Sequence, residues 1–497
     1  MNQTNKEIAK GAAWMVLFKF IDRGIGLMST LVLARLLVPA DFGLIAIAMM
    51  IINALALLIN FNFDVHLIQN KSAGRAQFDT AWTLNVILYG LLALTLAVLA
   101  RPAAGFYAEP RLAGVMYVLA LGLAIQGCSN VGLVQFRREM RFDREFRFML
   151  AKRAAPVAVT IPIALWLHSY WALALGQLAG TCGSVALSYF MSTYRPRLSL
   201  AARSELLHSS KWLLANSALE FLNGRAAELV IGKYAGAAGV GVYTISSEIS
   251  TLPTTELVAP INRAAFPGYA KVAHELPQLR HSFLSVISMI AVFAIPAGLG
   301  IACVADLMVP AVLGERWLHA IPLIQVLALY GMLGALHTNI NYVYLAVGKQ
   351  RLITGILFTH FLILIALVLP LTAHYGAIGA AWAFLGTAVM MMPVNQWLIT
   401  RQLQLTAFGY LARTWRPTAA GIVMAATLLG FKQALPVSGT ASYVAALLAS
   451  VAVGAVVYGL VLFVLWRLSG KPEGPERVCL NGIERLLGRA GLAIRLG

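Results

Sequence analysis

About fourteen apolar segments recur along the chain, and each is long enough to cross a lipid bilayer. A membrane-spanning helix needs about 20 mostly apolar residues, and 60% of the 497 residues are hydrophobic whereas only 12% are charged. This composition excludes a water-soluble globular protein. We therefore predict an all-α polytopic membrane protein whose spans lie near residues 11–37, 43–63, 81–100, 112–134, 149–167, 170–193, 210–232, 239–260, 283–304, 320–346, 352–372, 376–399, 417–433 and 442–466.

Lysine and arginine are distributed unevenly between the segments that connect these spans. Alternate connections and the two ends of the chain hold 29 of them, whereas the remaining connections hold 5. Cytoplasmic loops of membrane proteins carry such an excess of basic residues, so we expect both termini in the cytoplasm. The formal net charge of +18 then reflects topology and contact with anionic membrane lipids, and no nucleic-acid partner is expected.

An internal repeat appears when the sequence is shifted by 198 residues without gaps. WMVLFKFIDRGIGLMSTLVLARLLVPADFG (14–43) then aligns with WLLANSALEFLNGRAAELVIGKYAGAAGVG (212–241), so that Asp22 meets Glu220 and Gly43 meets Gly241. Because an even number of spans separates the copies, the repeats run parallel and are related by a pseudo-two-fold axis along the membrane normal. We predict two six-helix bundles, 1–200 and 201–402, then two helices in 403–470 and a basic cytoplasmic tail, 471–497.

Three charged residues, Lys19, Asp22 and Arg23, lie near the middle of the first predicted span. Each charge at a helix centre costs roughly 2.5–3.5 kcal/mol on insertion scales, so these side chains are not expected to face lipid. Their i, i+3, i+4 spacing places them on one helix face, where Asp22 can pair with either base. A central cavity between the two bundles would accommodate this face.

Polar residues in later spans extend the same prediction. An excess of basic side chains near mid-depth favours an anionic cargo, amides beside the tyrosines of HTNINYVY (337–344) suit sugars, and buried acids suit proton exchange. The alternative is that these groups only hold helices together. The candidates are Lys19, Arg23, Arg225, Asn339 and Asn341 for cargo binding, Asp22, Glu220 and Glu248 for proton coupling, and Arg35, Lys233 and Arg263 for a gate or an interface.

Motifs of nucleotide-driven pumps and hydrolases are absent: the chain has no GxxxxGK[ST], HExxH or GxSxG sequence. The four cysteines, Cys128, Cys182, Cys303 and Cys479, lack the spacing of metal ligands. We therefore expect no catalytic residue, metal or cofactor, and any transport would use an ion gradient.

Two stretches interleave apolar residues with arginines. FRREMRFDREFRFMLAKR (136–153) has the pattern of an interfacial amphipathic helix, and we interpret it as an anchor at the membrane surface. Contact with a cytoplasmic partner and capture of an anionic lipid headgroup are the alternatives. The tail PERVCLNGIERLLGRAGLAIRLG (475–497) gathers apolar residues on one helical face and is predicted to lie on the inner leaflet.

LARLLVPADFG (33–43) and AGAAGVGVYTISSEISTLPTTELVAPINRAAFPGYAKV (235–272) resemble signatures of the polysaccharide transporter family. The resemblance is to its colanic-acid-exporter-like branch, within the multidrug/oligosaccharidyl-lipid/polysaccharide exporter superfamily. Membership implies a flippase that moves polyprenyl-pyrophosphate-linked oligosaccharides across the bacterial inner membrane for exopolysaccharide or lipopolysaccharide biosynthesis, by ion-coupled alternating access. Polymerase or export machinery would be a further partner. The pyrophosphate contacts of Lys19, Arg23 and Arg225 are our own hypothesis, because these motifs carry no ligand contact.

Three other classes of protein, namely another exporter, an enzyme and a structural protein, are weighed against this function. A multidrug exporter of the same superfamily moves organic cations, which an acidic lumen without central bases would suit better. A polysaccharide polymerase or ligase usually needs a large periplasmic loop, and a lipid-sugar glycosyltransferase needs an acidic first outer loop, which here is only VPADF (38–42). A membrane protein with a purely structural role is least consistent with so many intramembrane charges.

Overall fold

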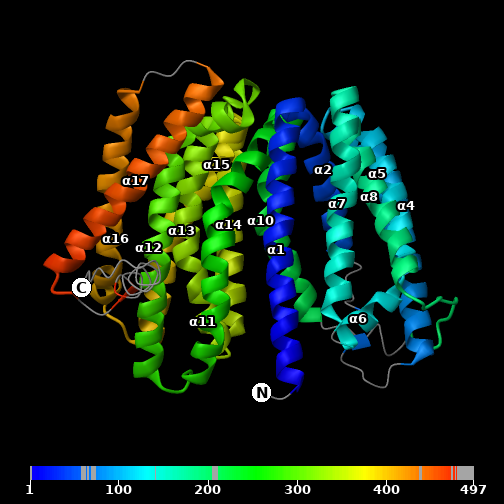
Figure 1. Ribbon diagram of the computed structural model, residues 1–497, viewed down its shortest axis with the longest axis horizontal. Helices are drawn as coiled ribbons and strands as arrows, with labels where there is room; N and C mark the ends of the chain where they lie inside the picture. The colour runs from blue at the N-terminus through cyan, green and yellow to red at the C-terminus, as the bar shows by residue number, and fades with distance from the viewer. Residues whose placement is uncertain are drawn as a thin grey trace, which may run out of the picture. The chain divides into compact units, whose positions relative to one another are not determined.

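The regular structure is entirely helical in the part of the chain that the computed structural model describes (Figure 1), namely residues 3–57, 63, 67–68, 74–139, 141–203, 211–435, 439–471, 474, 475 and 477. Each predicted apolar segment overlaps one of these helices. Within the described ranges, nine helices are long and apolar enough to span a membrane, and a pair of helices bent by 60° passes the same test when its two members are taken together. The protein is therefore a multi-span membrane protein, and the predicted all-α class is confirmed.

The chain forms two compact units, Met1–Gly241 and Val242–Gly497. The first predicted bundle, 1–200, lies within the first unit, which continues through Gly241, and the division into two six-helix bundles stays a prediction. The predicted tail, 471–497, lies almost wholly outside the described residues. The helices of the first unit are α1 (Gln3–Leu36), α2 (Pro39–Ala56), α4 (Arg75–Phe106), α5 (Arg111–Gly127), the 3₁₀ turn η2 (Val131–Leu133), α6 (Val134–Arg138), α7 (Phe142–Leu167), α8 (Trp171–Met191) and the first part of α10 (Lys211–Leu252).

A break inside α10 separates its two parts at Gly236, where φ is 65°. Only glycine adopts this backbone conformation without strain. The break falls between the predicted spans 210–232 and 239–260, so α10 consists of two helices that meet at Gly236.

Contacts between α1 and α7 close one side of the first unit. The Trp14 ring lies 4.7 Å from the Phe146 ring, and Phe18 meets the same ring edge-on at 6.4 Å. Aromatic pairs in these geometries add to the stabilisation that burial provides. Helix α7 also packs on α8, and α4 on α5.

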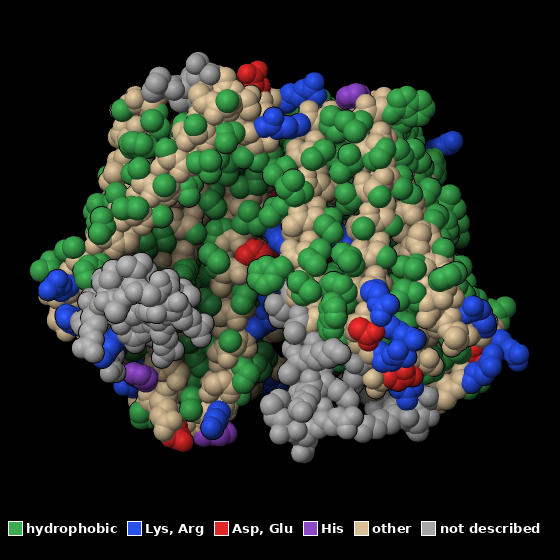
Figure 2. All heavy atoms as spheres, viewed as in Figure 1, with side chains coloured by type: hydrophobic (Ala, Val, Ile, Leu, Met, Phe, Trp, Pro, Cys, Tyr) green, Lys and Arg blue, Asp and Glu red, His purple; other side chains and the backbone are tan. Residues whose placement is uncertain are grey.

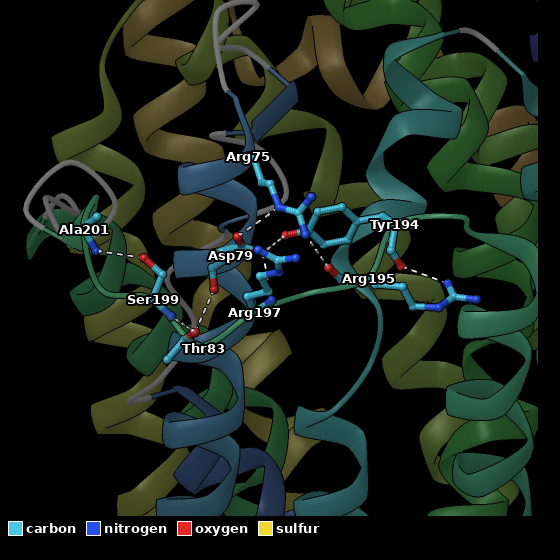
Figure 3. Close-up of polar contacts among 8 residues, drawn as sticks. All are labelled: Arg75, Asp79, Thr83, Tyr194, Arg195, Arg197, Ser199 and Ala201. Carbon is cyan, nitrogen blue, oxygen red and sulfur yellow. Dashed lines mark hydrogen bonds and ion pairs between the residues drawn. The ribbon is translucent and has the colours of Figure 1, made fainter.

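An extended segment, 192–203, follows α8 and is held against the first turns of α4 (Figure 3). Asp79 accepts hydrogen bonds from the Tyr194 hydroxyl and, at 2.9 Å, from the Arg197 backbone N–H. The Ser199 N–H donates to the Thr83 hydroxyl at 3.0 Å. Burial and the Asp79 carboxylate raise the pKa of Tyr194, so its hydroxyl stays protonated and able to donate. Helix side chains thus satisfy backbone groups that no sheet or helix pairs here.

The second unit begins within α10 and packs around α12 and α13, which contact each other; α12 also contacts α16 and α17. Its buried core includes Phe283, Ile287 and Tyr344. The remaining elements are the π-helix η3 (Pro253–Val258), α11 (Ala259–Lys271), α12 (Leu276–Met308), the π-helix η4 (Val309–Leu313), the 3₁₀ turn η5 (Glu315–Trp317), α13 (Ala320–Ala346), α14 (Gln350–Tyr375), α15 (Ala377–Leu403), α16 (Ala407–Gln433) and α17 (Thr440–Leu468).

Pro253 begins the π-helical turn η3, which follows α10. Hydroxyl groups around it bond to α13: Ser250 donates to the carbonyl of Ile324 at 3.2 Å, and Thr254 donates to the carbonyl of Gly331 at 3.0 Å. These hydroxyls hold α10 and η3 against α13, as polar residues between membrane helices commonly do.

Candidate functional site

A cavity of about 990 Å³ lies inside the first unit. Its walls come from α1, α2, α4, α5, α6, α7 and α8, with Phe221 of α10. The volume is at the upper end of the range of about 300–1,000 Å³ that is typical of ligand sites. Charged side chains gather at the end of this unit where α6 lies, below a face of mainly apolar side chains (Figures 1 and 2).

One part of the cavity wall is polar and uncharged. Asn85 and Tyr89 are four residues apart on α4 and therefore share a helix face. Asn53 of α2, Gln126 of α5 and Gln177 of α8 add further amides. Amides and a tyrosine can donate and accept hydrogen bonds without carrying charge. This part of the wall is suited to a hydroxyl-rich ligand.

The charged part of the wall contains three bases and two acids. Arg137 of α6 donates through Nε to Oε1 of Glu145 at 2.5 Å. Arg153 of α7 forms an ion pair with Asp22 of α1, with 3.0 Å between Nε and Oδ1. Lys152 lines the same cavity and has no ion-pair partner among the described residues. The described lining thus carries three positive charges and two negative charges.

The helical period of α7 explains why these residues face inward. Glu145, Met149, Lys152, Arg153 and Pro156 recur at intervals of three or four residues, apart from the adjacent pair, and all line the cavity. One helix face therefore lies along the cavity over about three turns.

The opposite face of α7 carries the exposed ion pair of Arg147 with Asp143, at 3.0 Å. The stretch 136–153 was interpreted as an anchor at the membrane surface. The structure corrects this interpretation for the cavity-lining face. The amphipathic pattern is real, but its basic face packs beside α1 because Gly26 leaves room there for the Arg153 side chain.

Of the residues predicted for the first cavity-forming span, Asp22 lines this cavity. Its expected partners were Lys19 and Arg23 on the same helix, and the structure adds Arg153 from a different helix. Lys19 is exposed and Arg23 is half-buried, and neither belongs to the cavity lining. Glu220, the repeat equivalent of Asp22, is exposed on α10.

Arg225 forms an ion pair with Glu228, three residues further along α10, at 2.5 Å. The Arg225 side chain is 43% exposed, whereas that of Glu228 is 5% exposed. The arginine therefore offers the buried acid a counter-charge. Its predicted role in cargo binding stays a prediction.

The residues predicted at helix ends lie at the surface of their units. Lys233 donates to the carbonyl of Phe106 at 3.0 Å, with its ammonium 4.5 Å from the centre of that ring. It thereby ties α10 to the end of α4. Arg35 is exposed in the last turn of α1, and Arg263 is exposed and donates to the carbonyl of Ala259 on its own helix.

The second unit holds the predicted sugar-binding amides. Asn339 is fully buried and accepts a hydrogen bond from the Tyr269 hydroxyl at 3.0 Å, which joins α13 to α11. This geometry corresponds to the helix-packing alternative. Asn341 and Glu248 are half-buried.

Sequence reasoning missed the cavity-forming role of Arg137, Glu145, Lys152 and Arg153. For Glu145, Lys152 and Arg153 the available signal was their recurrence on one helix face of 142–156, which local spacing could have revealed; Arg137 lies outside this stretch. That α7 lies beside α1, with over a hundred residues between them, is a long-range contact that this spacing does not encode.

Proteins of known identity resemble this chain over most of its length. It is 27% identical over 417 residues to the lipopolysaccharide biosynthesis protein WzxC of Escherichia coli (strain K12), covering 82% of this chain and 84% of that protein. It is 22% identical over 475 residues to the succinoglycan biosynthesis transport protein ExoT of Rhizobium meliloti (strain 1021), and the match covers 93% of this chain and 94% of that protein.

Solved structures share the fold. The lipid II flippase MurJ, in an inward closed conformation, matches with a TM-score of 0.71 at 12% identity, covering 91% of this chain and 98% of that one. An inward-facing multidrug resistance MATE family transporter of the MOP superfamily matches with a TM-score of 0.55 at 15% identity, and the match covers 81% of this chain and 94% of that one.

A family model described as polysaccharide biosynthesis protein matches residues 32–322, which is more than half of the chain. This match includes both stretches on which the resemblance to polysaccharide transporters was based, 33–43 and 235–272. The predicted relationship is confirmed: the chain belongs to the polysaccharide biosynthesis protein family.

Proposed function

We propose that the protein is a flippase that moves polyprenyl-pyrophosphate-linked oligosaccharides across the bacterial inner membrane. The observation that carries the proposal is a single cavity with basic side chains on one part of its wall and uncharged amides on another, inside a multi-span protein of a polysaccharide biosynthesis family. The relatives WzxC and ExoT support a role in building or transporting a surface polysaccharide. The fold shared with MurJ supports flipping as the activity.

The basic part of the wall is the proposed site for the pyrophosphate. Arg137 and Arg153 carry planar guanidinium groups, which bind phosphate oxygens with two parallel hydrogen bonds. Lys152 adds a further positive charge to the same part of the wall. A site partly withdrawn from water strengthens each of these interactions.

The amide part of the wall is the proposed site for the sugars. Asn53, Asn85 and Gln177 come from three different helices, so they can contact hydroxyls on different sides of one sugar. The apolar face of the Tyr89 ring can stack on the carbon side of a sugar ring.

The cavity is proposed to open on the cytoplasmic side, because Arg137 and Glu145 of the basic stretch 136–153 line it, and basic connections are expected to be cytoplasmic. Lys19, Arg23 and Arg225 are proposed to contact the cargo at other stages of transport, and Asp22, Glu220 and Glu248 to couple transport to protons. With no covalent step required, the protein acts as a transporter and not as an enzyme.

A multidrug exporter is the competing function, since a MATE family transporter shares the fold. The three bases among the cavity charges disfavour an organic cation as cargo. Uptake of an organic cation by everted vesicles, unaffected by lipid-linked sugar, would support this alternative.

Replacing Arg153 with Gln tests the proposal, because the variant keeps a polar side chain but removes its positive charge. We expect export of the polysaccharide to fall at least about tenfold, the loss that corresponds to one strong charged contact. The deletion strain complemented by each variant would be compared for surface polysaccharide, for accumulated lipid-linked repeat units and for the amount of protein in the membrane.

Arg147→Gln is the matched control, since Arg147 lies on the same helix and its ion pair with Asp143 is exposed. It should export as the wild type does. Normal export from Arg153→Gln, with protein levels unchanged, would show that the cavity does not bind the cargo.

A further inference from the structure

Two carboxylates stand in the part of the cavity that the proposed function assigns to an anion. Glu145 forms an ion pair with Arg137, and Asp22 forms one with Arg153. Both guanidinium groups are therefore paired with a carboxylate when the cavity contains no cargo. A cavity that only had to bind pyrophosphate tightly would not need them, because each acid repels the cargo and competes for its partner.

Helix packing alone does not explain these two pairs. The second carboxylate oxygen of Glu145, Oε2, is buried without a hydrogen-bond partner, and so is Nε of Arg153, whose approach to Asp22 is an ion pair but not a hydrogen bond. The Arg137 and Arg153 side chains are 48% and 40% exposed, so a ligand in the cavity can reach both guanidinium groups. The pairs therefore leave donors and acceptors that a ligand could satisfy.

The charges of the lining determine which anion can replace these acids. With both pairs formed, Lys152 supplies the one uncompensated positive charge among the described lining residues. A phosphodiester headgroup with one negative charge can neutralise Lys152, but it must then compete with a carboxylate for each guanidinium. A diphosphate brings a charge on each of two linked phosphates, and it can replace carboxylates at Arg137 and Arg153 in one binding event.

We propose that Glu145 and Asp22 are specificity-determining residues that keep the singly charged phosphodiester lipids of the bilayer out of the cavity and so reserve it for diphosphate-linked lipids. The inference rests on the proposed function, since it takes the cavity to be the cargo site. Surrounding phospholipids are in large excess over any lipid-linked sugar, so selectivity here requires repulsion of the wrong anion as well as attraction of the right one.

The test is the binding of farnesyl pyrophosphate to the purified full-length protein in phosphatidylcholine nanodiscs that contain increasing fractions of phosphatidylglycerol. For the wild type we expect an apparent Kd that changes little with phosphatidylglycerol. For Glu145→Gln we expect equal or tighter binding without phosphatidylglycerol, and at least about tenfold weaker binding at the highest fraction. Asp22→Asn should behave in the same way. If Glu145→Gln does not fold, the binding of farnesyl pyrophosphate to Asp22→Asn provides the test.

Asp143→Asn is the matched control, because Asp143 lies two residues from Glu145 but pairs with Arg147 at the surface. It should bind as the wild type does at every lipid composition. Glu145→Gln and Asp22→Asn variants that resist phosphatidylglycerol as well as the wild type would overturn the inference while leaving the diphosphate site intact. Failure of the wild type itself to bind farnesyl pyrophosphate in pure phosphatidylcholine would overturn the proposed function, and this inference with it.

Discussion

Gly26 determines how closely the guanidinium of Arg153 approaches α1. A methyl group added at Gly26 would lie 2.3 Å from Nη2 of Arg153, which is the far end of a flexible side chain. We therefore expect Gly26→Ala to displace the guanidinium and leave the helices in place. The free energy of unfolding should stay unchanged or rise by up to about 1 kcal/mol, since alanine favours a helix. Binding of farnesyl pyrophosphate should weaken about threefold to tenfold.

Gly24→Ala provides the control for this substitution, because a methyl group at Gly24 would meet no atom within 4 Å. Thermal unfolding and ligand binding would be measured on both variants. If Gly26→Ala binds as tightly as Gly24→Ala, the position of the Arg153 guanidinium does not matter for the cavity.

Single residues differ in how far the sequence predicts their surroundings. The intramembrane position of Asp22 followed from its place in an apolar segment, and the structure puts it on a cavity wall. Its partner Arg153 could not be predicted, because pairing of α1 with α7 depends on tertiary packing. Asn339 shows the reverse problem, since a polar residue in an apolar span is equally consistent with a ligand contact and with its observed bond to Tyr269.

The crossing of α2 with α10 depends on a pair of glycines that the internal repeat makes equivalent. A methyl group at Gly43 would lie 1.6 Å from the carbonyl oxygen of Ala237, and one at Gly241 would lie 1.8 Å from that of Pro39. Pro39 and Ala237 are themselves related by the shift of 198 residues, so the contact is reciprocal. Glycine allows helix backbones to approach this closely in a membrane.

Gly43→Ala and Gly241→Ala should each separate the two helices, because the blocking atoms belong to the backbone and cannot rotate away. Overpacking costs about 1–3 kcal/mol, and we expect a loss of thermal stability at the upper end of this range. One separation accommodates both methyl groups, so the double variant should lose less than the sum of the single losses. Gly90→Ala, where a methyl group would meet nothing within 4 Å, is the control. Additive losses would mean that the two glycines act independently.

Whole elements were more predictable than their partners. Segment length and hydropathy located the spans, and the positive φ at Gly236 falls between two of them. The face of α7 was assigned to the membrane surface, because an arginine-rich amphipathic helix has the same pattern whether its basic face meets lipid headgroups or a protein cavity. Only the contact of α7 with α1 distinguishes these two environments.

At the scale of the whole molecule, the proposed coupling of transport to protons depends on the ion pair between Asp22 and Arg153, whose side chains are 39% and 40% exposed. Partial exposure lets both cargo and protons reach the pair. A pyrophosphate that engaged Arg153 would remove the counter-charge of Asp22, and this is the physical basis for the proposed coupling of the carboxylate to protons. Cargo binding and proton binding would thus promote each other, as linkage requires.

Flipping of a fluorescent lipid-linked oligosaccharide in proteoliposomes, with and without an imposed pH gradient, tests this coupling. Asp22→Asn cannot take up a proton, so we expect it to flip at a rate that the gradient no longer stimulates. Glu220→Gln tests the exposed repeat equivalent of Asp22, and Asp143→Asn controls for the loss of a carboxylate outside the cavity. The wild type and Asp143→Asn should retain stimulation by the gradient. If Asp22→Asn and Glu220→Gln both retain it as well, neither acid couples transport to protons, and the coupling must use another group such as Glu248.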